Sequence, residues 1–279
     1  MIQRAVIAGG KTGGHLYPGI AVAEEILERN PEADVTFIGT QDGIESRVLP
    51  GLGFALHTIT VSRLKGAGVL SRLLGLLRVP VGLVQSWKLL RQLKPQVVLG
   101  VGGYASGPAL LAAWCARYPT AIQEQNATPG FTNRILGRLV RAVYLGFGAA
   151  RSHFAPDKVI ETGNPIRKAL RDQLSEAVQS AGPETDKTVF CLLVFGGSQG
   201  SRFLNEHIPQ ALQSQIELHP DFEIRVTHQT GLHDEETTRE RYESLQLSGH
   251  VEVVPYIHDM PTAYASADAA ICRAGALTV

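Results

Sequence analysis

The sequence predicts an α/β protein built from two doubly wound domains, and three observations support this. Short apolar runs rich in Val, Ile and Phe alternate with longer stretches of helical periodicity, which is typical of βαβ units around a parallel sheet. Two glycine-rich stretches, residues 9–14 and 196–200, each follow an apolar run. A helix-like run comes directly after each stretch. We therefore expect two Rossmann-like halves that face each other across a cleft.

Taken in order, the first domain is expected to span residues 1–165 and the second residues 166–279. The boundary follows Gly163-Asn164-Pro165, because proline and glycine interrupt regular structure. In the first domain, strands are predicted at 5–8, 34–38, 56–61, 97–101, 121–123, 142–145 and 159–162. In the second domain, strands are predicted at 188–195, 223–227, 251–254 and 269–272.

The composition narrows the class of protein. A chain of 279 residues with 44% hydrophobic and 19% charged residues suits a globular protein and not a disordered one. No leader pattern precedes the first predicted strand, and no apolar run reaches the length of a membrane span. The cysteines Cys115, Cys191 and Cys272 are far apart and lie in apolar runs. We expect them to be buried free thiols of a protein in a reducing compartment.

The first glycine-rich stretch, Gly9-Gly10-Lys11-Thr12-Gly13-Gly14, is a candidate phosphate site. Glycine admits a ligand to the backbone N–H groups at the start of a helix. A P-loop would need a glycine where Ala5 stands, and the fingerprint G-x-G-x-x-G is absent, so a plain strand-to-helix turn is the remaining alternative. His15 follows the glycines directly. It is either a proton acceptor at the mouth of the cleft or an ordinary surface or capping histidine.

Two further stretches place polar side chains at the ends of predicted strands. Tyr104 and Ser106 lie in a glycine loop after the strand at 97–101, and we expect both to point into the cleft. The run Gln123-Glu124-Gln125-Asn126 follows the strand that begins at Ala121. Ligands of open α/β sheets bind at the carboxyl ends of the strands, so a hydrogen-bonding site is favoured over a solvated turn.

Residues 46–123 contain no Asp or Glu but nine Lys or Arg residues, mixed with leucines. Basic and apolar residues without acids are typical of a surface that lies on an anionic membrane. The alternative is a cationic helix packed on the sheet. A nucleic-acid surface is disfavoured, because aromatic residues that could stack on bases are scarce there.

Residues 1–165 carry 17 basic and 10 acidic residues, whereas residues 166–279 carry 9 and 16, so the two halves have opposite net charge.

Six stretches together resemble one enzyme family: residues 10–15, 102–108, 124–126, 163–167, 196–200 and 273–279. They are similar to the peptidoglycan N-acetylglucosaminyltransferases of glycosyltransferase family 28, which have the GT-B fold. The resemblance implies inverting transfer of N-acetylglucosamine from UDP-N-acetylglucosamine to the C4 hydroxyl of undecaprenyl-diphospho-muramoyl-pentapeptide, that is, from lipid I to lipid II. It also implies a peripheral location on the cytoplasmic face of the bacterial plasma membrane.

The resemblance assigns roles to individual residues. It implies that His15 is the candidate base and that Tyr104 and Glu124 lie near the acceptor. The residues implied to bind substrate are Thr12, Gly13, Gly14, Asn126, Arg167, Ser198, Gln199, Ile257, Ala276, Leu277, Thr278 and Val279. Among these, Arg167 and Ser198 would hold the diphosphate and Ile257 would lie against the uracil.

No metal and no cofactor are expected. The sequence has no D-x-D motif, so helix N-termini, hydroxyl groups and Arg167 would stabilise the diphosphate leaving group. Two residues depart from the family pattern, because Lys11 stands where glycine is usual and Gln123 where histidine is common. The Ser-Glu and paired glutamines that follow Val279 in the family are not in this sequence. We therefore expect an incomplete second domain and little turnover; the alternatives are another GT-B glycolipid glycosyltransferase and a catalytically inactive nucleotide-binding fragment.

Overall fold

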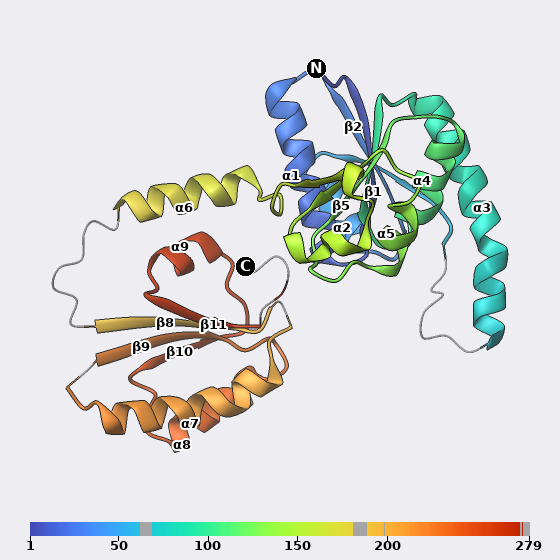
Figure 1. Cartoon of the computed structure of the whole chain (residues 1–279). Helices are drawn as coiled ribbons and strands as arrows, with labels where there is room; N and C mark the ends of the chain where they lie inside the picture. Colours follow the sequence, from blue (N-terminus) through green and yellow to red (C-terminus); the bar gives the residue numbers. More distant parts are fainter. Residues whose placement is uncertain (62–68, 181–188, 198, 222, 274, 276–279) are drawn as a thin grey trace. The chain divides into compact units, whose positions relative to one another are not determined.

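The computed structural model describes residues 1–61, 69–180, 189–197, 199–221, 223–273 and 275. The chain forms two compact units, Met1–Lys168 and Ala169–Val279, which we call the N-terminal unit and the C-terminal unit (Figure 1). Helix α6 (Lys168–Ser180) begins at the boundary between them. Each unit has its own parallel sheet and its own hydrophobic core.

The N-terminal unit is organised around a parallel sheet whose described strands run in the order β3-β2-β1-β4-β5-β6-β7. They are β1 (Arg4–Gly9), β2 (Asp34–Gly39), β3 (Ala55–Thr58), β4 (Val97–Gly102), β5 (Thr120–Glu124), β6 (Ala142–Leu145) and β7 (Val159–Glu161). All strands predicted here are present, although β3 ends at Thr58 and not at Val61. The strand order reverses between β1 and β4. The crevice at the carboxyl ends of these two strands is the ligand position of a doubly wound sheet.

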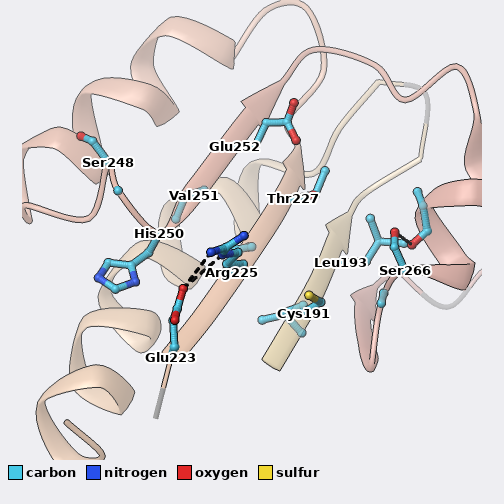
Figure 2. Close-up of a pocket in the computed structure, with 15 residues that line it drawn as sticks. Cys191, Leu193, Glu223, Arg225, Thr227, Ser248, His250, Val251, Glu252 and Ser266 are labelled. Carbon is cyan, nitrogen blue, oxygen red and sulfur yellow. Dashed lines mark hydrogen bonds and ion pairs between the residues drawn. The ribbon is translucent and has the colours of Figure 1, made fainter. Parts of the chain in front are cut away.

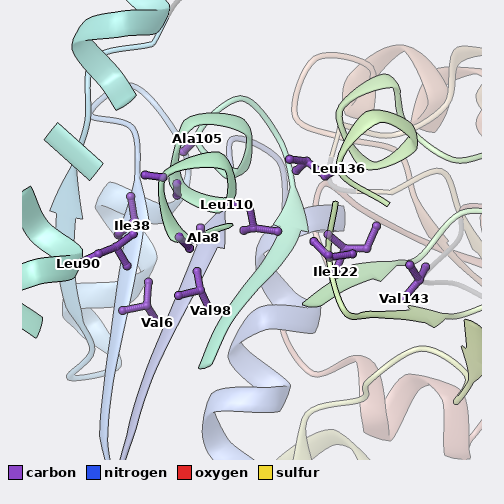
Figure 3. Close-up of a cluster of buried hydrophobic side chains, with 14 of the residues drawn as sticks. Val6, Ala8, Ile38, Leu90, Val98, Ala105, Leu110, Ile122, Leu136 and Val143 are labelled. Carbon is purple, nitrogen blue, oxygen red and sulfur yellow. The ribbon is translucent and has the colours of Figure 1, made fainter. Parts of the chain in front are cut away.

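Both faces of this sheet are covered, which explains why β1 is apolar and buried after its first residue, Arg4. Val6 and Ala8 belong to one buried cluster, whereas Ala5 and Ile7 belong to the cluster on the opposite face. Successive side chains of a strand point to opposite faces, so both sets are buried only when helices lie on both sides. Figure 3 shows the first cluster, in which side chains of the sheet meet Leu110 and other residues of the covering helices.

The helices of the N-terminal unit are α1 (Gly13–Arg29), α2 (Glu45–Gly51), α3 (Val69–Leu93), α4 (Ser106–Cys115) and α5 (Phe131–Leu136), with 3₁₀ turns at Gly148–His153 and Pro156–Lys158. Helix α1 has Arg29 in its last turn, where a cation interacts favourably with the helix dipole. None of the helices in the described ranges has both the length and the apolar character that crossing a bilayer requires.

The C-terminal unit has a smaller parallel sheet, in which the described strands run in the order β10-β9-β8-β11. Its elements are β8 (Val189–Phe195), α7 (Arg202–Leu218), β9 (Glu223–Gln229), α8 (Glu235–Ser244), β10 (Val251–Val254), α9 (Met260–Ala265) and β11 (Ala269–Cys272). The strands lie where the sequence predicts them. On α7, Leu204, Ile208 and Leu212 recur at helical spacing and join the core around Val194 and Val226. Helices α7 and α8 cover one side of this sheet, and α9 lies on the other (Figure 1).

The three cysteines are free thiols, but none of them is fully buried. Cys191 and Cys272 are half-buried, and Cys115 is exposed. The expectation of buried thiols is therefore wrong for Cys115, and it holds only in part for Cys191 and Cys272. Cys115 is the last residue of α4, and the neighbouring Trp114 is also exposed, so the helix emerges from the core at this end.

Candidate functional site

Two glycine loops lie against each other at the carboxyl ends of β1 and β4. The Gly10 N–H donates to the carbonyl oxygen of Gly102 at 3.3 Å. A Cβ atom at Gly9 would lie 2.3 Å from this same oxygen, and one at Gly103 would lie 2.5 Å from the carbonyl oxygen of Gly10. All four residues have φ angles between 86° and 145°, which favour glycine. These glycines are therefore required for the contact between the loops, whether or not a ligand is bound.

The residues that follow leave the first turn of α1 open. Thr12 is exposed, and within the described part of the chain its side chain makes no capping hydrogen bond. A Cβ atom at Gly14 would meet no atom within 4 Å. The first N–H groups of a helix have no partner inside the helix, and the helix dipole is positive at this end. Helix α1 therefore offers N–H donors and positive potential beside Gly13 and Gly14, which suits an anionic ligand.

His15 lies half-buried in the first turn of α1. Its Nδ1 atom is hydrogen-bonded to the side-chain amide of Gln125. Burial lowers the pKa of His15, whereas the charge of Glu124 and a hydrogen bond to the backbone of Val101 oppose this effect in part. Because the pKa lies below its usual range, the imidazole is neutral at pH 7. This is the form that accepts a proton.

Glu124 is buried, with 1% of its surface exposed, and four donors surround its carboxylate. Oε1 accepts hydrogen bonds from the N–H and the side-chain amide of Asn126, both at 2.9 Å. Oε2 accepts from the Gly130 N–H at 3.1 Å and from the side-chain amide of Asn133 at 2.9 Å. The carboxylate therefore fixes the loop after β5 and holds Asn126 at the carboxyl edge of the sheet. Its charge also favours the protonated form of His15.

The loop after β4 places Tyr104 and Ser106 differently. The ammonium nitrogen of Lys11 lies 5.0 Å from the centroid of the Tyr104 ring, which is the geometry of a cation–π contact. Ser106 is completely buried, and its hydroxyl donates to the carbonyl oxygen of Gly103 at 2.9 Å. The expectation that Ser106 points into a cleft is therefore wrong. Its hydroxyl instead stabilises the turn that leads into α4.

The contacts of two side chains at this site do not follow from the sequence pattern. Gln125 holds the imidazole of His15, whereas the sequence indicates it only as a member of the polar run 123–126. Glu45 accepts a hydrogen bond from the Lys11 N–H at 2.6 Å. The one local sign of this contact is Gly43, whose missing side chain leaves room for the Glu45 carboxylate. The two residues are far apart in the sequence, so no spacing rule links Glu45 to Lys11.

In the C-terminal unit, the second glycine stretch ends β8 and leads into α7. Gln229, the last residue of β9, donates from Nε2 to the carbonyl oxygen of Gly197 at 2.8 Å. Its Oε1 accepts from the Ile257 N–H, also at 2.8 Å. One side chain thus holds the glycine loop and the Ile257 segment together at the carboxyl edge of the sheet. A Cβ atom at Gly200 would lie 1.7 Å from the carbonyl oxygen of Thr230, so this glycine is also required for loop packing.

The other residues implied to bind the donor fall into three groups. Gln199 is exposed in the loop after β8. Five of these residues lie outside the part of the chain that the structure describes: Ser198, Ala276, Leu277, Thr278 and Val279. Arg167 lies in the N-terminal unit, where its Nη2 and Nε atoms donate to one carboxylate oxygen of Glu24 at 2.7 and 3.0 Å. A diphosphate that binds Arg167 must therefore compete with this ion pair.

A cavity of about 470 Å³ lies on the sheet of the C-terminal unit, but it is not part of the site (Figure 2). Its lining includes Glu223, Arg225 and Glu252 from the first halves of β9 and β10. Glu223 and Arg225 form an ion pair with 3.0 Å between Oε1 and Nη2. The carboxyl ends of these strands, where Gln229 binds the glycine loop, lie at the opposite edge of the sheet.

The arrangement indicates a class of chemistry. The N-terminal unit combines a neutral imidazole, a buried carboxylate and an open helix N-terminus, which suits deprotonation of a hydroxyl group on a phosphorylated substrate. The C-terminal unit places a glycine loop before a helix, which suits the phosphates of a nucleotide. Across the described ranges, no three His, Cys, Asp or Glu side chains are grouped so that they could hold a metal ion.

Comparison with known families and proteins agrees with this chemistry. Residues 5–145 match the glycosyltransferase family 28 N-terminal domain, and residues 191–279 match the glycosyltransferase family 28 C-terminal domain. A UDP-N-acetylglucosamine--N-acetylmuramyl-(pentapeptide) pyrophosphoryl-undecaprenol N-acetylglucosamine transferase of Anaeromyxobacter sp. is 49% identical over 277 residues. These cover 99% of this chain and 70% of that protein. The protein of the same name from Myxococcus xanthus is 47% identical, over 100% of this chain and 70% of its own length.

Solved structures show the same similarity. The crystal structure of Acinetobacter baumannii MurG has a TM-score of 0.78 and 32% identity, and the match covers 99% of this chain and 75% of that one. The structure of UDP-GlcNAc 2-epimerase from Neisseria meningitidis bound to UDP-GlcNAc has a TM-score of 0.66 and 16% identity, over 98% and 78% of the two chains. At that level of identity the likeness extends to the fold alone.

Proposed function

The chain belongs to glycosyltransferase family 28, and on this premise we propose that it transfers N-acetylglucosamine from UDP-N-acetylglucosamine to lipid I. The acceptor is the C4 hydroxyl of a polyprenyl-diphosphate-linked muramoyl-pentapeptide, and the product is lipid II, a peptidoglycan precursor. The observation that carries this proposal is His15, a neutral imidazole held by Gln125 beside the open N-terminus of α1. The relatives that are 47% and 49% identical support the choice of substrates.

In the proposed reaction, the C4 oxygen of the acceptor attacks C1 of N-acetylglucosamine. The bond between C1 and the UDP oxygen breaks, with inversion at C1. His15 accepts the proton of the attacking hydroxyl, and the nearby charge of Glu124 stabilises the imidazolium that forms. Tyr104 lies at the same carboxyl edge of the sheet and is assigned to the acceptor side, whereas Asn126 is assigned to substrate binding beside Thr12, Gly13 and Gly14.

We assign the UDP moiety to the C-terminal unit. Negative charge develops on the diphosphate as UDP departs, and the N–H groups at the start of α7 would favour that charge. Gln229 holds the glycine loop to Ile257, which supports the assignment of Ile257 to the uracil. The proposed reaction uses no cofactor and no metal ion, so transfer is expected to continue in the presence of EDTA.

We also propose that the N-terminal unit binds the cytoplasmic surface of an anionic membrane through part of the span 46–123. Exposed residues of α3 that support this are Val81, Val84, Trp87, Lys88 and Arg91. Exposed apolar side chains next to basic ones adsorb to anionic lipid surfaces. Arg63 and Lys65, which belong to the same span, lie outside the described residues. Binding to phosphatidylglycerol vesicles but not to phosphatidylcholine vesicles would support this surface, and equal binding to both would contradict it.

The transfer proposal is tested with sugar-labelled UDP-N-acetylglucosamine and a short-chain lipid I analogue. Wild-type protein is expected to label the analogue with few turnovers, and His15→Ala to do so at least about 100-fold more slowly. The affinity for UDP, measured by calorimetry, is expected to be unchanged in His15→Ala. Binding of UDP without any transfer by the wild type would indicate a nucleotide-binding protein without activity. Labelling of a different glycolipid in place of the lipid I analogue would contradict the proposed acceptor.

A further inference from the structure

Glu45 is a buried carboxylate that joins the loops after β1 and β2. Only 1% of its surface is exposed. Oε2 accepts the Lys11 N–H at 2.6 Å, and Oε1 accepts both the N–H and the hydroxyl of Thr40 at 2.8 Å. These three donors are neutral. Burial of a carboxylate is unfavourable unless hydrogen bonds compensate for the lost water, so this arrangement points to a specific role.

Three glycines make room for this carboxylate. A Cβ atom at Gly10 would lie 2.5 Å from the Glu45 side chain, one at Gly39 2.7 Å and one at Gly43 2.0 Å. Contacts this short do not occur for a real Cβ atom, so side chains at these positions would displace the carboxylate. Gly10 follows β1 and Gly39 ends β2, so residues from two strand ends are adapted to the same carboxylate.

The residue that Glu45 holds has an unusual backbone conformation. Lys11 has a φ angle of 76°, in the left-handed region that is strained for residues other than glycine. A hydrogen bond from its N–H to a charged carboxylate offsets this strain. The turn at Lys11 leads directly into Thr12 and α1, and it places the Lys11 ammonium over the ring of Tyr104.

We propose that Glu45 is a positioning residue of the acceptor site. Its carboxylate holds Lys11 in the left-handed conformation, and Lys11 in turn places its own ammonium and the start of α1 for the diphosphate of the acceptor. Glu45 itself contacts no substrate. This inference rests on the proposed function, because it takes the N-terminal unit as the acceptor side.

Glu45→Gln is the most informative variant. Thr40 donates two hydrogen bonds to Oε1, so the amide oxygen of a glutamine would take that place. The amide NH₂ would then face the Lys11 N–H, donor against donor. Thr40→Val is the matched control, because it removes one hydrogen bond to the same carboxylate and leaves the bond to Lys11 intact. Both variants are expected to lower thermal stability, but only Glu45→Gln releases Lys11.

Amide hydrogen exchange tests the positioning role without any substrate. The Lys11 amide is expected to exchange at least about 10-fold faster in Glu45→Gln than in the wild type, and to stay within about 2-fold in Thr40→Val. No acceleration in Glu45→Gln, or equal acceleration in both variants, would overturn the proposal. This result does not depend on whether the acceptor is assigned correctly.

Acceptor binding tests the functional consequence, with the short-chain lipid I analogue as the probe. Glu45→Gln is expected to weaken its binding about 10-fold and to leave UDP affinity unchanged. In a Lys11→Gly background, glycine adopts the left-handed conformation freely. Glu45→Gln should therefore weaken binding of the lipid I analogue less than about 2-fold in this background. Equal losses in both backgrounds would mean that Glu45 does not act through Lys11, and would overturn the proposal.

The two proposals can fail separately. If the wild-type protein binds no lipid I analogue, the proposed function is wrong, whatever the exchange experiment shows for Lys11. If the wild type binds the analogue and Glu45→Gln binds it equally well, only the role of Glu45 is wrong.

Discussion

The Nδ1 atom of His15 and the side-chain amide of Gln125 are hydrogen-bonded to each other, although 110 positions separate them in the sequence. His15 lies on the helix that follows β1, and Gln125 follows β5. The side-chain amide of Asn164 donates to the carbonyl oxygen of Gln125 at 3.2 Å. The imidazole is thus oriented by a residue that is itself tied to the last segment of the N-terminal unit.

The titration of His15 is expected to depend on Glu124. The charge of Glu124 raises the pKa of His15, against the larger effect of burial, which lowers it. Glu124→Gln removes this charge, so the pKa of His15 should fall further below 6.5. Transfer would then persist to lower pH, because His15 must be deprotonated to act as a base. NMR titration of the imidazole protons measures this pKa, and an unchanged or higher pKa in the variant would contradict the assignment.

Gly102 is expected to tolerate no side chain. A Cβ atom there would lie 2.6 Å from His15 Nδ1, and its φ angle of 93° is strained for alanine. Gly102→Ala should therefore lower the free energy of unfolding by about 2 kcal/mol and displace the imidazole. Gly51→Ala is the control, since a Cβ atom at this helical position meets nothing within 4 Å. Urea unfolding, followed by the fluorescence of Trp87 and Trp114, measures the free energy of unfolding of both variants. Equal values for the two would contradict the steric requirement for glycine at position 102.

Gly14→Ala is expected to raise stability and to weaken acceptor binding. Gly14 lies in the first turn of α1 with open space beside it, so Gly14→Ala should raise the free energy of unfolding by about 0.5–1 kcal/mol. If the acceptor approaches the backbone here, the added methyl group should weaken lipid I analogue binding several-fold. The expected outcome is a more stable protein that binds less well. A stabilised variant with unchanged acceptor affinity would show that the α1 N-terminus is not a binding surface.

Acid should destabilise the C-terminal unit through His228. This residue is completely buried, its Nδ1 atom lies 2.8 Å from the Tyr242 hydroxyl, and burial lowers its pKa to about 4. An unfolded histidine has a pKa of about 6.5, so between these values the unfolded state binds the proton more tightly. The C-terminal unit therefore keeps its full free energy of unfolding above about pH 6.5, and this free energy falls by about 3 kcal/mol as the pH approaches 4.

His228→Gln should remove this part of the pH dependence, because glutamine takes up no proton in this range. Hydrogen exchange of β9 peptides in urea at pH 7 and pH 5 reports on the C-terminal unit. Fluorescence of Trp87 and Trp114, both in the N-terminal unit, serves as the internal reference. If the wild type and the variant lose the same stability between the two pH values, another group is responsible.

The sequence is sufficient to locate the strands, and the reason is their burial. Strands such as β1 and β4 are covered on both faces, so they stand out as short apolar runs between helical stretches. The position of His15 is also predictable, because a strand, a glycine turn and a helix follow one another locally. The site is thus predictable where it depends on one continuous segment.

The remaining parts of the site depend on contacts between distant segments. Gly43 leaves room for the Glu45 carboxylate, but no pattern near Glu45 shows that it reaches Lys11, because that contact requires β1 and β2 to lie side by side. The prediction for Ser106 is wrong because its hydroxyl donates to the carbonyl oxygen of Gly103, and such a contact within a turn cannot be read from residue types. The ion pair of Arg167 with Glu24 likewise joins the end of the N-terminal unit to α1.

All described strands of the first sheet, from Arg4 to Glu161, precede those of the second sheet, from Val189 to Cys272. During translation, β7 therefore leaves the ribosome before β8, and the N-terminal unit can complete its core while the rest of the chain is still being made. Within that unit, β1 lies between β2 and β4, so one edge of β1 stays unpaired until β4 has emerged. In this interval its unpaired backbone N–H and C=O groups can pair with another nascent chain.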